Sequence, residues 1–448
     1  MSVYLKISRF FLFLIPLTVF LVTPQTLFPF IVGKYSFFRL MVDVSLIFLM
    51  LAWAKGNVEI DWRTFKRPLA LGVIIWVAVF LLATIFAYDS WAAFWGNFER
   101  GESGVQLLHL LIFFFLLTVL LKNKSDWESF LKMNVLGGFL VIVYGLLAGR
   151  VAGFVGPAFS LHTRFQGSLG NPDYIGQYML FLVFFALYLL FEHSAFSKKT
   201  SLIYGFWAIL FFVAFTFSQT RGAFLGFTAA ILAFLIYLIF NAPKKKQKII
   251  FTILFLFIVI GIGVFISFRH SPFVKNLPVV GRFADISLES ARGRVLTWQS
   301  ALLAIKDRPL LGWGPENFSV AFDKYFNPGH FDPEGGGETW FDRAHSVILD
   351  YAAETGLLGL AAYLGMFVLY YVQFFQSNKI KKQQITSYPK QNQSLGVNYK
   401  PLITHSLFFA MPIGYLVTGA TLFDVLPMYL VLFTFLALTN KIYSVHYN

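Results

Sequence analysis

The stretch WFDRAHSVILDYAAETGLLGL, residues 340–360, places one histidine among charged side chains at the start of an apolar segment. His345 has four charged neighbours in this stretch, which are Asp342, Arg343, Asp350 and Glu354. An imidazole with an ordinary pKa of about 6.5 can act as a general base at neutral pH. Nearby arginine charge lowers the pKa of a histidine, and a carboxylate can orient its ring. We therefore take His345 as a candidate base oriented by one of the three carboxylates; the alternative is a helix-start histidine that only makes a buried hydrogen bond.

A set of arginines forms the second group of candidates. They lie beside apolar segments or in loops, at Arg100, Arg164, Arg221, Arg294 and Arg343. Arg221, in FSQTRGAFLGF, follows the shortest polar break between two apolar runs, where a solvated charge has little room. A planar guanidinium binds phosphate with two parallel hydrogen bonds, so such a set suits a lipid diphosphate headgroup. The alternative, an arginine that only extends its head to the membrane surface, stays open for Arg100 in particular.

Metal and thiol chemistry find little support in the sequence. There is no cysteine, which excludes thiolate catalysis and disulfides within the chain. Neither H-E-x-x-H nor another closely spaced pair of ligating histidines occurs. Asp332, Glu334 and Glu338 belong to a Gly-rich loop and fit a solvated charge run better than a metal site. We expect no metal and no cofactor.

Long apolar segments position these side chains. Of 448 residues, 57% are hydrophobic, 13% are charged and 56 are Phe, a composition that cannot cover a soluble surface. Runs of about 20 apolar residues can cross a hydrocarbon layer of about 30 Å. The sequence predicts an all-α polytopic membrane protein with about twelve spans. These lie at roughly 7–24, 36–54, 68–88, 104–121, 133–153, 175–192, 201–217, 223–241, 249–268, 356–376, 401–421 and 426–440.

The basic residues predict the topology. With both termini in the cytoplasm, most of the 36 Lys and Arg fall on the inside, as the positive-inside rule requires. The net charge of +14 is then a topology signal rather than a nucleic-acid site. The candidate arginines and His345 lie on the outer side of this topology.

The predicted organisation has three parts. Residues 1–268 hold the first nine spans, residues 269–344 form a large extracytoplasmic loop, and residues 345–448 hold a short amphipathic helix and the last three spans, with a flexible cytoplasmic linker at 377–400. Within the loop, helical spacing of apolar residues predicts an amphipathic helix that Pro309 and Gly312 end. Its apolar positions are Val295, Trp298, Ala301, Leu302 and Ile305.

Several motifs resemble those of one membrane family. R-x-x-x-W (Arg294 and Trp298), RPLLGWGPENF (308–318) and DRAHSVILDYAAETGLLGL (342–360) resemble the signature of the O-antigen ligase and O-antigen polymerase superfamily. This superfamily includes bacterial oligosaccharyltransferases that glycosylate proteins. RFQGSLGNP and SQTRGAFLG are similar to two further outside motifs, and FERGESG to a weaker first one. The resemblance covers roughly residues 95–365.

The resemblance implies a metal-independent, inverting glycosyltransferase of the helical membrane type. It would move a glycan from undecaprenyl diphosphate to an acceptor hydroxyl at the outer face of the plasma membrane. Arg221 and Arg294 would hold the diphosphate and His345 would be the catalytic histidine; we group Arg164, Arg100 and Arg343 with the donor contacts. The loop helix would close over the donor, and an apolar groove would take the polyprenyl chain. Ser346 stands where the family usually has Asn, and we expect it to cap the helix start.

Alternatives remain at two levels. Within the family the acceptor can be a lipid A core, a growing glycan or a protein, so a ligase is the first expectation, a polymerase the second and a protein oligosaccharyltransferase the third. A different class, a polysaccharide flippase or other twelve-span transporter, fits the spans equally well, but no repeated half-pattern is visible. A peptidoglycan polymerase would share the architecture, although no matching loop motif occurs.

Overall fold

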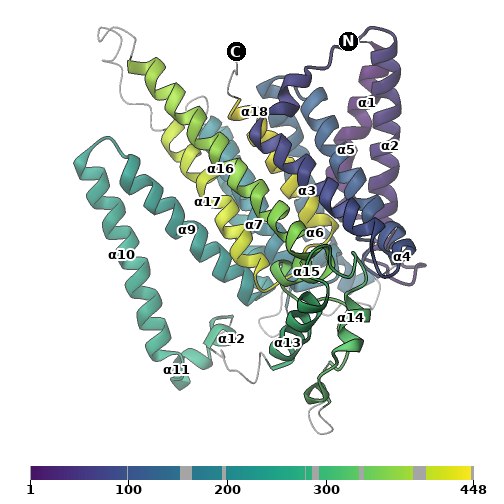
Figure 1. Cartoon of the computed structure of the whole chain (residues 1–448). Coiled ribbons are helices and arrows are strands. Elements are labelled where there is room, and N and C mark those ends of the chain that lie inside the picture. Colours follow the sequence, from purple (N-terminus) through teal and green to yellow (C-terminus); the bar gives the residue numbers. More distant parts are fainter. Residues whose placement is uncertain are drawn as a thin grey trace. The chain divides into compact units, whose positions relative to one another are not determined.

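The computed structural model describes residues 2–97, 99–151, 164–193, 198–277, 279–284, 292–331, 338–386 and 400–444. These residues form helices and loops without a strand (Figure 1). Ten of the described helical segments are long and apolar enough to cross a membrane, and two shorter apolar helices occupy the positions of the predicted fourth and twelfth spans. The predicted fold class is confirmed, and the chain is a multi-pass membrane protein.

The helices divide between two compact units. Unit 1 comprises Met1–Gly137, Gly293–Gly396 and Phe423–Asn448, and unit 2 comprises Gly138–Arg292 and Val397–Leu422. Unit 1 holds α1 (Val3–Leu14), η1 (Ile15–Phe20), α2 (Val32–Ala54), η2 (Trp62–Lys66), α3 (Pro68–Ile85), α4 (Ser90–Trp95), α5 (Gly104–Leu120), α13 (Arg292–Asp307), α14 (Phe318–Lys324), η4 (Pro328–His330), α15 (Val347–Glu354), α16 (Gly356–Thr386) and α18 (Leu426–Ile442). Unit 2 holds η3 (Gly167–Leu169), α7 (Pro172–His193), α8 (Lys198–Ser218), α9 (Arg221–Asn241), α10 (Lys245–Phe268), α11 (Pro272–Lys275), α12 (Val280–Ala284) and α17 (Lys400–Gly419). Helix α6 (Lys124–Val151) begins in unit 1 and ends in unit 2.

Two predicted boundaries are wrong, each for a local reason. The first span begins at Val3 rather than near residue 7, and it changes from α to 3-10 at Ile15. Pro16 has no N–H and its ring clashes with an α-helical interior, which explains the change. Helix α16 continues to Thr386, so the first part of the predicted linker 377–400 is helical; residues 387–399 lie outside the described part. No Gly or Pro precedes Pro389 in that segment to stop the helix.

Unit 1 is held by aromatic packing between α3, α16 and α18. The Trp76 ring of α3 lies 5.5 Å, between centroids, from both Tyr363 of α16 and Phe433 of α18. Gln373 of α16 accepts the backbone N–H of Leu69 at 3.0 Å, which satisfies an orphan donor at the start of α3. Figure 1 shows α13, α14 and α15 gathered at the end of these helices opposite the N-terminus.

The loop segment of unit 1 has a small core of its own. Its buried residues are Ala301, Phe318, Phe322, Phe341, Ala344 and Ala353, with Trp298, Ile305 and Leu349 packed against them. The predicted loop helix is confirmed as α13. Its predicted apolar face is only partly right, since Val295 and Leu302 are 36% and 58% exposed. The inward face is narrower because the small core offers partners only to Trp298, Ala301 and Ile305.

The RPLLGWGPENF motif fastens the loop to the α15–α16 junction. Trp313 and Gly314 donate their backbone N–H groups to the carbonyls of Ala353 and Glu354, at 2.9 and 2.7 Å. Gly312 has a φ of 69°, and a Cβ there would lie 2.5 Å from the carbonyl of Glu354. Only glycine allows this backbone conformation and this close approach together.

Unit 2 contains a large apolar cavity. Helices α9 and α17 pack closely where Gly226 faces Gly414, since a Cβ on Gly226 would lie 2.4 Å from the Gly414 carbonyl. Beside this contact lies a cavity of about 410 Å³. Apolar side chains of α7, α9, α10 and α17 line it, among them Phe184, Phe227, Ile231, Ile258 and Met411.

Candidate active site

The turn at residues 342–346, called the His345 turn below, brings the loop back to α15. His345 has a φ of 56°, in the left-handed region that non-glycine residues rarely adopt. Three bonds hold the turn around it: Ala344 donates its N–H to Asp350 Oδ1 at 2.6 Å, Trp298 Nε1 donates to the Ala344 carbonyl at 2.9 Å, and Asp350 N–H donates to the Ser346 carbonyl at 2.8 Å. A strained residue persists only where its surroundings determine it this firmly, and such residues cluster at functional sites.

The ring of His345 has a defined orientation. Its Nδ1 lies 3.2 Å from the carbonyl oxygen of Arg343. A carbonyl only accepts, so Nδ1 carries the proton and Nε2 of the neutral ring keeps its lone pair. Phe341 and Phe423 meet the ring edge to face, with centroids at 5.5 and 5.0 Å. Two aromatic rings thus pack against the imidazole, and its basic nitrogen is defined.

The surroundings keep His345 neutral. Burial lowers the pKa of His345 below its ordinary value; the bond to the Arg343 carbonyl opposes this, and the charges of Arg294 and Arg100 add to the lowering. A neutral ring at neutral pH is what a general base requires. The expected carboxylate partner is wrong, because among the described residues the ring nitrogens bond to a backbone carbonyl and to no carboxylate.

Asp342 is occupied by Arg100. Arg100 Nε and Nη2 donate to the two carboxylate oxygens of Asp342 at 2.7 and 2.9 Å, and its guanidinium lies 4.9 Å from the Phe423 ring centroid. Burial by itself raises the pKa of Asp342, but the hydrogen bonds from Arg100 hold it below the usual value. Arg100 therefore supports the His345 turn, and a role in donor binding gains no support from this contact.

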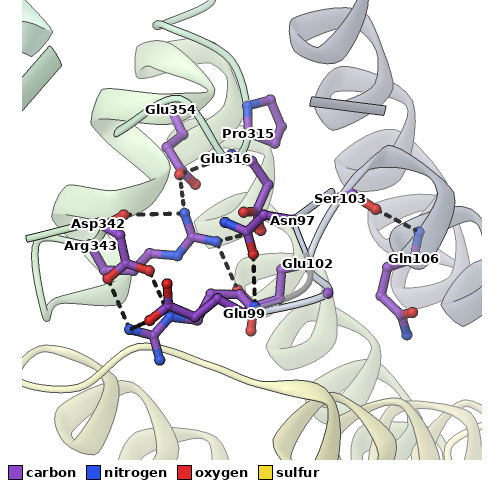
Figure 2. Close-up of polar contacts among 12 residues, drawn as sticks. Asn97, Glu99, Glu102, Ser103, Gln106, Pro315, Glu316, Asp342, Arg343 and Glu354 are labelled. Atoms are coloured by element: carbon purple, nitrogen blue, oxygen red, sulfur yellow. Dashed lines mark hydrogen bonds and ion pairs between the residues drawn. The ribbon is translucent and has the colours of Figure 1, made fainter. Parts of the chain in front are cut away.

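Arg343 lies inside a buried cluster of carboxylates (Figure 2). Its side chain is 3% exposed and donates to Glu354 Oε1 at 2.5 Å and Glu316 Oε1 at 2.6 Å, with Glu102 Oε2 at 3.5 Å. This geometry does not support the prediction that Arg343 binds the donor, since its guanidinium is taken up by protein carboxylates. Sequence reasoning missed Glu102 and Glu316; the signal available was the place of Glu102 in the motif FERGESG and of Glu316 in GWGPENF.

A cavity of about 40 Å³ adjoins this cluster. Five acidic residues line it beside the single Arg343: Glu102, Glu316, Asp350, Glu354 and Asp424. Burial raises the pKa of Glu354 to about 8 and that of Asp350 to about 7, although the charge of Arg343 opposes both shifts. The cavity therefore holds protons as well as charge at neutral pH.

Arg294 differs from Arg100 and Arg343, the other two candidate arginines of unit 1. It is half-buried in the first turn of α13, and it makes no hydrogen bond or ion pair with the residues that the structure describes. The first turn of a helix disfavours a cation, because the helix dipole is positive there. Its charge is close enough to lower the pKa of His345. Arg294 is thus a cation at the positive end of a helix dipole and near a neutral base. This position is suited to binding an anionic ligand.

Arg164 and Arg221 join two motifs within unit 2. The guanidinium of Arg164 forms an ion pair with Asp173 and donates to the Ser218 carbonyl and to Thr220 Oγ1, each at 3.0 Å. It thereby ties RFQGSLGNP to the predicted tight turn, which is confirmed between the end of α8 at Ser218 and the start of α9 at Arg221. Arg221 Nε donates to the carbonyl of Arg282 at 3.0 Å. Their predicted contacts with a donor stay predictions.

Two smaller expectations have clear outcomes. Ser346 occupies the N-cap position of α15, but its buried side chain makes no capping bond, so that expectation is wrong. Asp350 instead accepts the N–H of Ala344, which precedes the N-cap. Glu338 is exposed, as expected of a solvated charge, whereas Asp332 and Glu334 lie outside the described residues. Within the described residues no three His, Asp or Glu side chains form a metal-ligand group.

Comparison with known proteins bears on the family. Residues 206–364 match the family model described as O-antigen ligase. The matched range includes Arg221, α13, Glu316 and the His345 turn, while Arg100 and Arg164 precede it. No curated protein matches the chain. The family match covers the three motifs that carried the sequence resemblance, and it supports the O-antigen ligase superfamily and a membrane glycan transferase of that general kind.

Proposed function

We propose that the protein transfers a glycan from undecaprenyl diphosphate to an acceptor hydroxyl at the outer face of the plasma membrane, with inversion at the anomeric carbon and without a metal ion. One observation carries this proposal. The Nδ1 of His345 bonds to the Arg343 carbonyl, so Nε2 is the basic nitrogen of the neutral ring, and the charge of Arg294, which has no protein partner among the described residues, lowers the pKa of His345. A base beside an available cation suits the transfer of a sugar away from a phosphate.

The proposed step balances as a single displacement. The acceptor oxygen forms a bond to the anomeric carbon while the bond from that carbon to the phosphate oxygen breaks. The electron pair of the broken bond goes to the diphosphate, and the hydroxyl proton goes to Nε2 of His345. A positioned general base contributes about 10²–10⁴-fold to such a rate. Arg294 would stabilise the charge that grows on the diphosphate, as a preorganised cation does.

Two further residues and one cavity are proposed to serve the donor. Arg221 and Arg164 are carried over from the motif resemblance as diphosphate contacts. The apolar cavity of unit 2 suits a hydrocarbon chain, since every residue that lines it is apolar. A polyprenyl tail is therefore its proposed occupant.

The proposed topology has both termini in the cytoplasm and the loop helices outside. The acceptor is proposed to be a lipid-linked core sugar, as in a ligase; a growing glycan or a protein hydroxyl would use the same donor chemistry. A transporter is the less supported class. Transporters hold their polar sites near the middle of their spans, whereas the polar cluster of unit 1 gathers around loop residues Glu102, Glu316 and Arg343.

The test is turnover by the purified full chain with an undecaprenyl-diphosphate-linked oligosaccharide and each acceptor class in turn. Release of undecaprenyl diphosphate and mass spectrometry of the glycosylated product give the rate and the acceptor. We expect His345→Ala to lose transfer and EDTA to leave the wild-type rate unchanged. Near wild-type transfer by His345→Ala would overturn the base, and loss of activity in EDTA would overturn the metal-independent mechanism.

A further inference from the structure

Arg343 makes two kinds of contact at once. Its guanidinium is buried against Glu316 and Glu354, and its backbone carbonyl accepts the Nδ1 proton of His345. The first contact fixes the side chain, and through it the position of the backbone that carries the carbonyl. The second contact decides which nitrogen of His345 carries a proton.

The two residues bonded to Arg343 in this way are both strained. Glu316 has a φ of 63° and His345 a φ of 56°, and neither is glycine. Glu316 is further held by Glu354, whose Oε1 accepts the Glu316 N–H at 3.1 Å. Arg343 therefore connects two strained backbone positions, Glu316 through its guanidinium and His345 through its backbone carbonyl. Such strain is retained where a fixed side-chain position is needed.

We propose that Arg343 is a positioning residue: its hydrogen bonds to Glu316 and Glu354 hold the carbonyl that fixes the His345 ring as the Nδ1–H tautomer. The proposal rests on the proposed role of His345 as the base. It assigns Arg343 a function other than donor binding, and it adds Glu316 and Glu354 to the residues on which transfer depends.

The charges around the cluster fit this role. Arg343 is faced by Glu316 from the loop before α14, Glu354 from α15 and Glu102 from the loop before α5, with Asp342 next to it in the chain and Asp350 and Asp424 on the wall of the adjoining cavity. Burial raises the pKa of Glu316, and the charge of Arg343 and its hydrogen bond oppose this rise. Lysine keeps the charge but has no planar fork to bridge two carboxylates.

The experiment compares Arg343→Lys with Arg308→Lys in the full chain. Arg308 is a matched control because its guanidinium lies 4.6 Å from the Trp313 ring centroid, in the same loop segment. We expect Arg343→Lys to lower kcat by about 100-fold, the effect of displacing a catalytic group by about 1 Å. Its Kd for undecaprenyl diphosphate should stay within about twofold of the wild type, because a buried side chain does not touch the donor. Arg308→Lys should change neither.

A spectroscopic measurement separates positioning from general destabilisation. In ¹⁵N-histidine NMR spectra, the signals of His345 are identified by their loss in His345→Gln. The wild type and Arg308→Lys should show the Nδ1–H tautomer, and Arg343→Lys a mixture of tautomers. If Arg343→Lys fails to fold, the milder change Glu316→Gln replaces it. This variant should also show a mixture of tautomers and a lower kcat.

The outcomes distinguish this inference from the proposed function. A wild-type tautomer and kcat in the folded Arg343→Lys variant, or in Glu316→Gln, would overturn the positioning role. A tenfold weaker Kd for undecaprenyl diphosphate with the tautomer kept would make Arg343 a donor ligand instead. Wild-type transfer by His345→Ala would remove the base, and the tautomer measurement would then still decide whether Arg343 orients the ring.

Discussion

His345 and Arg343 are two residues apart in sequence, and the Nδ1 of the one lies 3.2 Å from the carbonyl oxygen of the other. This bond turns a histidine that could protonate at either nitrogen into one whose basic nitrogen is Nε2. Phe341 and Phe423 pack against the ring and limit its movement. The chemistry of the site depends on this pair, and so does the pH dependence of transfer.

The rate of transfer should stay high at a pH at which a histidine with an ordinary pKa would already be protonated. A general base must be neutral, and burial with the Arg294 and Arg100 charges lowers the pKa of His345. As pH falls through that lowered pKa, the base is protonated and kcat/KM falls about tenfold per pH unit. We expect the midpoint of this fall in kcat/KM to lie below the ordinary histidine pKa of about 6.5. A profile of kcat/KM from about pH 5 to 8 measures it, and a midpoint at or above the ordinary value would contradict the prediction.

Arg294→Ala should weaken binding of the donor as well as transfer. Its guanidinium has no protein partner among the described residues, so its removal leaves no carboxylate unpaired. We expect undecaprenyl diphosphate to bind at least about tenfold more weakly, the effect of one lost charge-assisted hydrogen bond. Arg308→Ala removes the same charge from the same loop segment and should bind as the wild type does. Equal affinities of the two variants would exclude Arg294 as a diphosphate ligand.

Arg221→Lys tests the geometry of the second proposed phosphate ligand. Lysine keeps the charge but cannot present two parallel donors, so transfer should fall although the charge is kept. Arg164→Lys should show the smaller effect on donor affinity, because Arg164 is engaged by Asp173 and the turn at 218–220. The donor KM of each variant gives the comparison. An unimpaired Arg221→Lys variant would leave Arg221 as a residue that only marks the end of a span.

Features that depend on nearby residues were predictable from the sequence. The spans follow from the length of apolar runs, the end of α13 from Pro309 and Gly312, and the tight turn before Arg221 from its few polar residues. The lowered pKa of His345 also followed, although burial rather than arginine charge is its largest cause. In each case the deciding interaction lies within a few residues or in the composition of a segment.

The partners of the charged side chains were not predictable in the same way. Arg100 and Asp342 are 242 residues apart, and Arg343 and Glu316 are 27 apart. Helical spacing and motif order carry no information on which carboxylate meets which arginine across folded loops. For this reason five arginines looked alike in the sequence, whereas in unit 1 two of them pair with carboxylates and Arg294 has no described partner.

Gly312→Ala should destabilise the loop and reduce transfer. The Cβ would lie 2.5 Å from the carbonyl of Glu354, and the alanine would have to adopt a φ of 69°. Backbone strain of this kind costs about 1–3 kcal/mol, and the clash would displace the end of α15 that carries Glu354. Gly365→Ala in α16 is the control, since no atom lies within 4 Å of its Cβ position. Thermal unfolding in detergent should show a lower Tm for Gly312→Ala alone; equal Tm values would contradict the close packing of the loop on the α15–α16 junction.

Filling the apolar cavity of unit 2 should affect the donor according to the length of its tail. Ile231 lines the cavity, whereas Leu225 of the same helix is 56% exposed and does not. A Trp at position 231 takes up space that a polyprenyl chain would use, and overpacking makes the cavity unavailable to it. Ile231→Trp should therefore raise KM for the undecaprenyl-linked donor, while a short-chain analogue with the same diphosphate and glycan keeps its wild-type KM. Leu225→Trp should leave both values unchanged. The difference between the two donors is the decisive quantity, because a variant that only disturbed folding would impair transfer from both, and an equal effect on both would remove the cavity as the site of the lipid tail.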